Sequence, residues 1–510
     1  MGDLNVYGGA GGMDARLDDL DLHAKQIDDC ADRVWHIARQ VGAIGASIDL
    51  AQAAALCPVE VAAVEASVAK AAGGGLTPDA LTMDVFAHCV KASAVTYRAA
   101  DLAHERIMHA ITMGMGISAG SFVFTPPGAL FAGSVAFLAW QKPDEFSRIV
   151  YENPWLMDET ATILPWALQS ATFTVASLTP FGRPGVIALT EGHWPATTYR
   201  EAVEGTLAML ENAGAVSGDG SFHLGDPYVR QDTPDRLYAD NALQTLMGAH
   251  DMDDEAAPED PYAQIQIMDV LDDHGQIVGH VVQIPGTEDW STHRTVNPSD
   301  AYGCLTAAAQ RQTMMQDMAE EAMRKHGVTG DVPVMITGHS QGGMNAAALA
   351  SDPDFVGRYN VTNLLTGGSP TGRFDIDPRV QALLIENTPD PVPYLDAADN
   401  PDRDNMTTVQ YDLPPVDATP NPVEAHRLSS YEEVARLADQ SHHPSIDRWR
   451  EQAGPLLDGT GLRTTTYKIL PDEPPLPIEP SHGRSGTVLG HPASPPAEPG
   501  YGYGSPYDKR

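Results

Sequence analysis

Basic side chains and cysteines are scarce in this chain of 510 residues. Only 31 Lys and Arg stand against 69 Asp and Glu, which gives a formal net charge of −38. A protein that binds nucleic acid needs a basic face for the phosphates, so this balance argues against a nucleic-acid partner. The 4 cysteines lie far apart without C-x-x-C spacing, so they predict no zinc site, and no disulfide pairing can be deduced from them.

Two further features are missing from the sequence. The start, Met1 to Leu4, has neither the basic region nor the apolar core of a signal peptide, so we expect no classical secretion signal. Residues 110–140 contain no charged side chain, but Pro126 and Pro127 divide them into halves shorter than the roughly 20 residues of a spanning helix. Two interpretations stay open: an apolar hairpin that touches a membrane, or a pair of buried helices.

The most informative stretch is an apolar run, Val332 to Thr337, followed by Gly338-His339-Ser340-Gln341-Gly342. A G-x-S-x-G turn between a buried strand and a helix holds its serine in a strained, exposed position. The run has strand composition, and Met344 to Ala350 is a strong helix former, so the required context is present. We therefore predict that Ser340 is a nucleophile. His339 is expected to be a packing or substrate-facing neighbour.

A serine nucleophile needs a base and an acid that orients the base, in the chain order Ser, Asp, His. The acid candidate is Asp390, which follows the apolar run Val380 to Glu386. The carboxyl ends of parallel strands are where open α/β sheets place functional groups. A carboxylate that only caps a turn is the alternative, because Asp before Pro often does so.

His426 is the predicted base. Ser429 with Glu432, or Ser430 with Glu433, forms the pattern of a capping box, which predicts a helix that begins just after His426 and leaves its imidazole on a loop. His442 and His443 also lie ahead of a helix start and are the alternative bases.

The oxyanion of an acyl-transfer intermediate needs two N–H donors, one of them from the residue after the nucleophile. That residue is Gln341. The second donor is expected from a loop after an earlier strand, and the amide of Thr287, in the segment Ile284 to Trp290, is the candidate. An ordinary glycine turn is the alternative interpretation of this segment.

Apolar runs alternate with helix-forming segments in the second half of the chain, which predicts an α/β fold with a largely parallel central sheet. Tyr262 to Leu271 and Gln276 to Ile284 are predicted to form a hairpin of strands, because a turn sequence joins them. The predicted organisation is a helical domain at 1–109, an apolar hairpin or linker at 110–141, a mixed helical region that could serve as a lid or cap at 142–260, a catalytic α/β domain at 261–470 and a disordered tail at 471–510.

Taken together, the Gly286-Thr287 pair, the Gly-His-Ser-Gln-Gly turn and Asp390-Pro391-Val392-Pro393 resemble the class 3 (fungal-type) lipases of the α/β-hydrolase family. The likeness covers about residues 262–470. It implies an α/β-hydrolase fold and a lipidic ester substrate, with Ser340, Asp390 and His426 as the catalytic triad and the amides of Thr287 and Gln341 as the oxyanion hole. This chemistry needs no metal or cofactor. That family commonly carries Arg where this chain has Pro285.

The Ala-rich N-terminal region ends in a predicted helix with Tyr97 and Asp101 at Y-x-x-x-D spacing. In this respect it resembles the WXG100-like substrates of type VII (ESX) secretion, although Trp35 lacks the glycine of the W-x-G turn. The resemblance implies a secreted or cell-envelope protein, with a cytoplasmic one as the alternative, and a secretion chaperone or helical partner. A partner-binding or membrane-inserting protein with secondary hydrolase activity, or an acyltransferase, is the alternative function.

Overall fold

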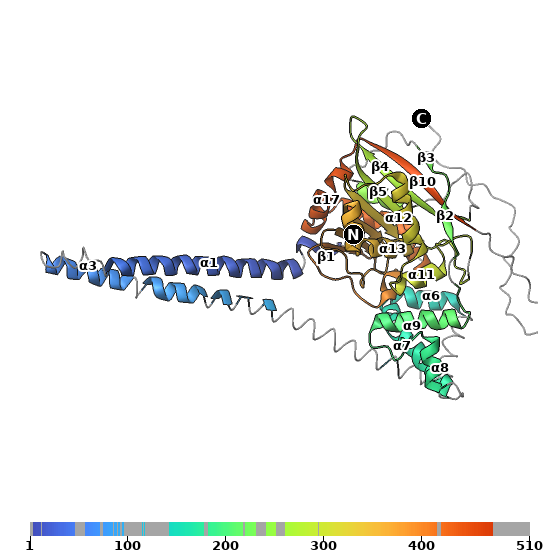
Figure 1. Cartoon of the computed structure of the whole chain (residues 1–510), viewed down its shortest axis with the longest axis horizontal. Coiled ribbons are helices and arrows are strands. Elements are labelled where there is room, and N and C mark those ends of the chain that lie inside the picture. The colour runs from blue at the N-terminus through green and yellow to red at the C-terminus, as the bar shows by residue number, and fades with distance from the viewer. Residues whose placement is uncertain are drawn as a thin grey trace, which may run out of the picture. The chain divides into compact units, whose positions relative to one another are not determined.

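The computed structural model (Figure 1) describes residues 4–11, 13–45, 57–71, 75–84, 86–88, 90–91, 94–95, 115, 117, 142–177, 182–217, 220–230, 241–250, 261–293, 295–415 and 420–472. Tyr97, Asp101 and residues 473–510 of the predicted tail lie outside these residues, whereas Pro471, at which the tail was predicted to begin, is the last residue of a strand. Of the apolar segment 110–140, only Met115 and Ile117 are described.

A ten-stranded mixed sheet forms the centre of an α/β fold, in the order β1-β9-β8-β7-β6-β5-β4-β10-β2, with β3 also paired to β10. Its five central strands are parallel, as predicted. A tight turn cannot join two parallel neighbours, so a long crossover segment connects such strands. The parallel strands are β5 (Ile277–Ile284), β6 (Val334–His339), β7 (Val361–Gly367), β8 (Gln381–Asn387) and β9 (Met406–Tyr411).

Antiparallel strands extend the sheet on both sides. β4 pairs with β5 as the predicted hairpin, and the turn at Asp272 to Gly275 joins them. β10 pairs with β4, and β1 closes the opposite edge by pairing with β9. These outer strands are β1 (Asn5–Gly8), β2 (Phe222–Leu224), β3 (Tyr228–Arg230), β4 (Gln264–Leu271) and β10 (Gly461–Pro471).

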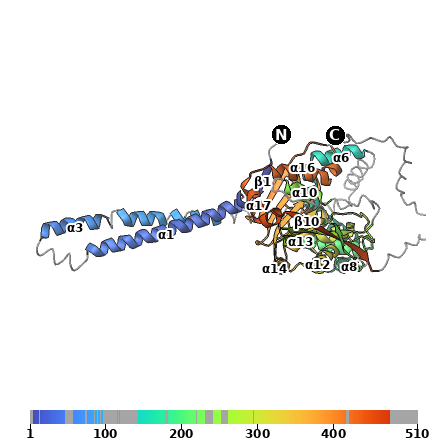
Figure 2. The ribbon, with the colours of Figure 1, turned by 90° about the horizontal axis from the view of Figure 1, so that it is seen from above.

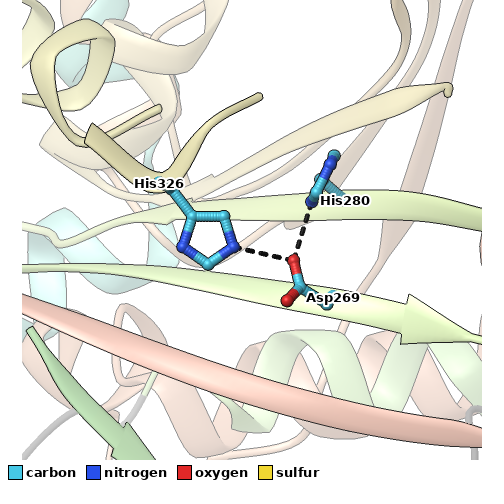
Figure 3. A group of neighbouring side chains, drawn as sticks. All are labelled: Asp269, His280 and His326. Carbon is cyan, nitrogen blue, oxygen red and sulfur yellow. Dashed lines mark hydrogen bonds and ion pairs between the residues drawn. The ribbon is translucent and has the colours of Figure 1, made fainter. Parts of the chain in front are cut away.

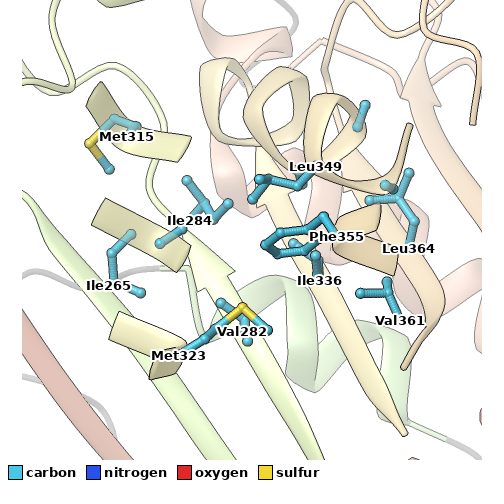
Figure 4. Close-up of a cluster of buried hydrophobic side chains, with 14 of the residues drawn as sticks. Ile265, Val282, Ile284, Met315, Met323, Ile336, Leu349, Phe355, Val361 and Leu364 are labelled. Carbon is cyan, nitrogen blue, oxygen red and sulfur yellow. The ribbon is translucent and has the colours of Figure 1, made fainter. Parts of the chain in front are cut away.

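Both faces of the sheet are buried, which explains why the central strands are almost continuously apolar. In β6, Val334 and Ile336 point into one hydrophobic cluster and Met335 into the other, as the two-residue period of a strand requires. Figure 4 shows the first cluster, in which Met315 and Met323 of α12 and Phe355 of α14 pack against strand residues.

Helices cover the two faces. α12 (Met314–His326), α13 (Gln341–Ala350) and α14 (Pro353–Tyr359) pack on the face of the first cluster. α10 (Ala242–Gly248), α16 (Leu428–Asp439) and α17 (Pro444–Leu457) pack on the other. Further helices in the described part of the chain are α6 (Pro143–Glu152), α7 (Trp155–Ser177), α8 (Gly182–Leu189), α9 (Tyr199–Asn212), α11 (Ala301–Ala308), α15 (Pro422–Ala425) and the 3-10 turns η1 (Gly9–Gly11) and η3 (Val392–Asp396).

The N-terminal region is mainly helical but not entirely so, because it also contains β1. α1 (Met13–Gly45) and α3 (Pro58–Ala71) lie side by side (Figure 2). Buried residues recur every seven positions, the spacing of a coiled-coil seam, and most are alanines that let helices approach closely. They are Leu17, Ala24, Ala31 and Ala38 in α1, and Ala80, Ala87 and Ala94 farther along the chain.

No helix among the described residues has both the length and the apolar character needed to cross a membrane. Cys30, Cys57 and Cys304 are free thiols. Burial raises the pKa of Cys304 to about 11, so this thiol stays protonated at neutral pH.

Candidate active site

Ser340 lies at the sharp turn between β6 and α13. Its backbone has φ 56° and ψ −127°, a conformation that residues other than glycine rarely adopt. The turn is possible because its flanking residues are glycines. A Cβ on Gly338 would lie 2.2 Å from the Gly342 carbonyl carbon, and a Cβ on Gly342 would lie 2.2 Å from the Ile284 carbonyl oxygen. The strand, turn and helix therefore have the predicted geometry.

Ser340, His426 and Asp390 form a continuous chain of hydrogen bonds, although they lie far apart in the sequence. His426 Nε2 is 2.9 Å from Ser340 Oγ, and His426 Nδ1 is 2.7 Å from Asp390 Oδ2. Asp390 is completely buried, whereas 9% of Ser340 and 22% of the His426 side chain are exposed. His426 is thus partly exposed to solvent, whereas Ser340 is nearly buried and the carboxylate is fully shielded from water.

The Asp390 carboxylate accepts three hydrogen bonds. The backbone N–H of Val392 donates to Oδ1 at 2.9 Å, while the hydroxyl of Tyr431 donates to Oδ2 at 2.5 Å beside His426. Tyr431 is fully buried in α16. Burial, followed by the charge of Asp390, raises the pKa of Tyr431 well above its usual value, so the phenol keeps its proton and remains a donor.

His426 lies between two helices. It is the C-terminal cap of α15, and α16 begins at Leu428 with Arg427 as its N-cap. The predicted capping box is wrong, because Ser429 and Ser430 both lie inside α16 and no side chain caps that helix. His426 still takes the predicted place ahead of a helix.

The two alternative bases lie elsewhere. His442 is exposed. His443 is the N-cap of α17, where its Nδ1 accepts a hydrogen bond from the Ser445 backbone N–H at 3.3 Å.

His339 stacks on the His426 ring, with centroids 4.9 Å apart and planes inclined by 28°. Its Nε2 lies 3.1 Å from the carbonyl oxygen of His426, which can only accept, so Nε2 carries the proton. Burial, then the nearby His426 and His250, lower the pKa of His339 well below its usual value. His339 is therefore a neutral neighbour that braces the backbone of His426.

The two predicted oxyanion donors lie close together. Gln341 is the first residue of α13, so its N–H belongs to the first helical turn and has no acceptor within the helix. Thr287 follows β5 by three residues, and its hydroxyl donates to Gln341 Oε1 at 2.9 Å. Gly286 packs against the Ser340 side chain, since a Cβ added there would lie 3.4 Å from Ser340 Cβ. Pro285 does not prevent this approach.

The chain has no detectable relative in three comparisons. No protein-family model, curated protein or solved structure matches it. The roles of Ser340, Asp390 and His426 therefore rest on their geometry and chemistry.

Two contributors to the site were not predicted from the sequence. Tyr431 is five residues beyond His426, and nothing in the pattern around it indicates a hydrogen bond to Asp390. α7 packs against η3, the short turn that directly follows Asp390. This contact places part of the predicted 142–260 region beside the acid loop. The sequence signal that could have indicated a buried helix beside Asp390 is weak: it consists of the short apolar runs within α7.

Proposed function

We propose that this chain is a serine hydrolase of the α/β-hydrolase type that cleaves carboxylic esters through an acyl-enzyme. The observation that carries the proposal is the unbroken sequence of contacts from Ser340 Oγ through His426 to Asp390, at 2.9 and 2.7 Å, on a strained strand-to-helix turn. A serine that is merely structural needs neither the strain nor an imidazole oriented by a buried carboxylate.

The first half of the reaction is acylation. His426 Nε2 takes the proton of Ser340 as the oxygen attacks the ester carbonyl, and Asp390 holds Nδ1–H and stabilises the imidazolium that forms. The backbone N–H groups of Gln341 and Thr287 donate to the oxyanion. His426 then gives its proton to the leaving alcohol, and Ser340 is left as an ester of the acyl group.

In the second half, water takes the place of the alcohol. His426 removes a proton from the water, which attacks the acyl-serine carbonyl, and a second oxyanion forms at the same donors. Its collapse releases the carboxylic acid and returns the proton to Ser340. Every group acts twice, so loss of any member of the triad slows both steps.

A lipidic acyl group is the proposed substrate class, supported by the resemblance of the motifs to class 3 lipases. The packing of α7 on η3 supports a further role for residues 142–177 as a cap next to the acid loop. Hydrolysis across a series of acyl lengths distinguishes a lipase from a short-chain esterase.

The deciding experiment is p-nitrophenyl ester hydrolysis with fluorophosphonate labelling, wild type against Ser340→Ala. We expect the substitution to abolish both turnover and label. Ser351→Ala is the matched control, because Ser351 lies just beyond the same helix and its hydroxyl donates to the Ala347 carbonyl at the end of that helix. A Ser340→Ala protein that still turns over and labels like wild type refutes the proposal.

The N-terminal helices support a second proposal, export through a type VII system with a helical partner. Besides its buried alanines, α1 carries large apolar side chains that are exposed to solvent: Leu22 is 52% exposed, Ile37 47% and Ile44 55%. Trp35 Nε1 donates to Asp84 Oδ2 at 2.9 Å, which ties α1 to a later helical segment. Fractionation of a host with its type VII system intact or deleted tests this, since export that is equal in both hosts contradicts it.

A further inference from the structure

A second group of polar side chains lies inside the sheet, far from the serine. Asp269 of β4 is completely buried, and Arg463 of β10 and His280 of β5 are its direct cross-strand partners on either side. His326, the last residue of α12, lies over the same row. Figure 3 shows His280 and His326 converging on the Asp269 carboxylate from separate elements.

The contacts of this cluster are specific. His280 Nδ1 and His326 Nε2 each lie 2.8 Å from Asp269 Oδ1, whereas the Arg463 guanidinium donates to Oδ2. The two rings stand at 89° to each other. Arg463 thus satisfies Oδ2, while Oδ1 and the two imidazole nitrogens form one compact group of three atoms that can each ligate a metal.

We propose that Asp269, His280 and His326 bind a divalent d-block cation, with Zn²⁺ as the best fit. Two imidazole nitrogens and one carboxylate oxygen are a donor set typical of zinc sites with an open fourth position. The three donor atoms all lie within 4.8 Å of one another. Bonds of about 2.0–2.1 Å to zinc put tetrahedral ligands about 3.3 Å apart, so each nitrogen must move from the oxygen by about 0.5 Å.

The surroundings of the cluster suit a bound metal. His326 Nδ1 lies 3.0 Å from the Tyr467 hydroxyl oxygen, which accepts a hydrogen bond from Nδ1–H when Nε2 ligates the metal. Outer hydrogen bonds of this kind fix the tautomer and orientation of a metal-binding histidine. His280 and His326 also line a cavity of about 570 Å³, which leaves room for water or an anion as the fourth ligand.

The cavity is less suited to a free anion as its primary ligand. Its Arg and Lys side chains are already engaged: Arg463 is paired with Asp269, and Lys325 Nζ donates to the carbonyls of Leu224 and Gly225.

The proposed metal site is also separate from the serine. His280 is paired with Val334 at the start of β6, and Ser340 follows the end of that strand about 20 Å away at about 3.3 Å per residue.

The test is metal binding by the full chain after chelator treatment, with titrations of Zn²⁺ followed by calorimetry and of Co²⁺ followed by its visible absorption. The variants are His280→Gln and His326→Gln, which keep a side-chain donor for Asp269. His274→Gln is the matched control, because His274 is exposed in the β4–β5 turn. The wild type, the two cluster variants and the control all keep every cysteine, so any binding of metal to thiols is the same in the four proteins.

We expect one Zn²⁺ per wild-type chain, Co²⁺ bands of a four- or five-coordinate site, and a rise in Tm of about 3 °C at 100 times the dissociation constant. Each cluster variant should bind at least about 100-fold more weakly, as expected for loss of a ligand, whereas His274→Gln should bind like wild type. Equal binding in wild type and both cluster variants overturns the proposal, as does a Tm rise with inorganic phosphate but none with Zn²⁺.

Discussion

Replacement of Asp390 by Asn tests the proposed chemistry most directly, because the structure dictates how the new amide must orient. The carboxylate accepts one bond at Oδ1, from Val392 N–H, and two at Oδ2, from His426 and Tyr431. An asparagine has one acceptor oxygen and one NH₂ donor, so it must place the NH₂ on one of these two sides.

Placing the NH₂ against Val392 sets two donors face to face and leaves a buried N–H unpaired, at a cost of about 1–3 kcal/mol. Placing it toward His426 costs less, because the Tyr431 hydroxyl can rotate to accept and the imidazole can change tautomer. In that tautomer Nε2 carries the proton and donates to Ser340 Oγ. The base then cannot accept the serine proton.

We therefore expect Asp390→Asn to fold but to lose about 10⁴-fold in kcat/KM, which corresponds to about 5.5 kcal/mol of transition-state stabilisation. The assay is p-nitrophenyl ester hydrolysis, with the rate of fluorophosphonate labelling and the Tm measured alongside. Asp273→Asn, at an exposed position in the β4–β5 turn, is the control. An Asp390→Asn enzyme with more than a tenth of wild-type activity would refute the assignment of Asp390 as the orienting acid.

Three other predictions follow from the same region. Tyr431→Phe removes a donor from the buried carboxylate, so the free energy of unfolding should fall by about 1.5–3 kcal/mol in chemical denaturation, with a smaller loss of rate than in Asp390→Asn; an unchanged stability would contradict the hydrogen bond. Gly342→Ala puts a Cβ 2.2 Å from the Ile284 carbonyl, so we expect a loss of about 3 kcal/mol and of labelling, whereas Gly42→Ala in α1 has open space and should be neutral or stabilising. Burial raises the pKa of Asp396 to about 7, so the folded chain holds a proton that the unfolded chain releases above its ordinary value of 3.8. Stability from this group should therefore fall by up to about 4 kcal/mol as the pH rises from about 4 to 7. Denaturation midpoints across that range should show the fall in wild type and a flatter profile in Asp396→Asn.

The parts of the site that follow from local rules could be predicted from the sequence. The sharp turn at Ser340 is one of these, because the residues that specify its strand, its glycines and its helix all lie within a dozen positions. The chain order of acid and base then limits the search to loops after later strands, which is enough to find Asp390 and His426. The reason given for His426 was partly wrong, since the helix after it begins without the predicted capping box.

Features created by distant partners could not be predicted. β9 follows an acidic stretch with Asp399, Asp402 and Asp404 and was not predicted, and its six residues form a strand because β8 and β1 flank it. The bond from Tyr431 to Asp390 depends on how α16 packs. The group formed by Asp269, His280 and His326 likewise comes from three elements whose proximity only the register of the sheet establishes.

The pairing of β1 with β9 has a consequence for how the molecule is made. Asn5 and Gln410, whose side chains are hydrogen-bonded at 2.9 Å, are 405 positions apart. Ser445 Oγ also donates to the Gly8 carbonyl at 2.8 Å. During synthesis β1 must wait until about 400 further residues have emerged before its partner exists, while β9 has an open edge until the two meet. An exposed strand edge invites pairing with other chains, so the pairing of β9 with a strand made about 400 residues earlier also protects this edge against aggregation.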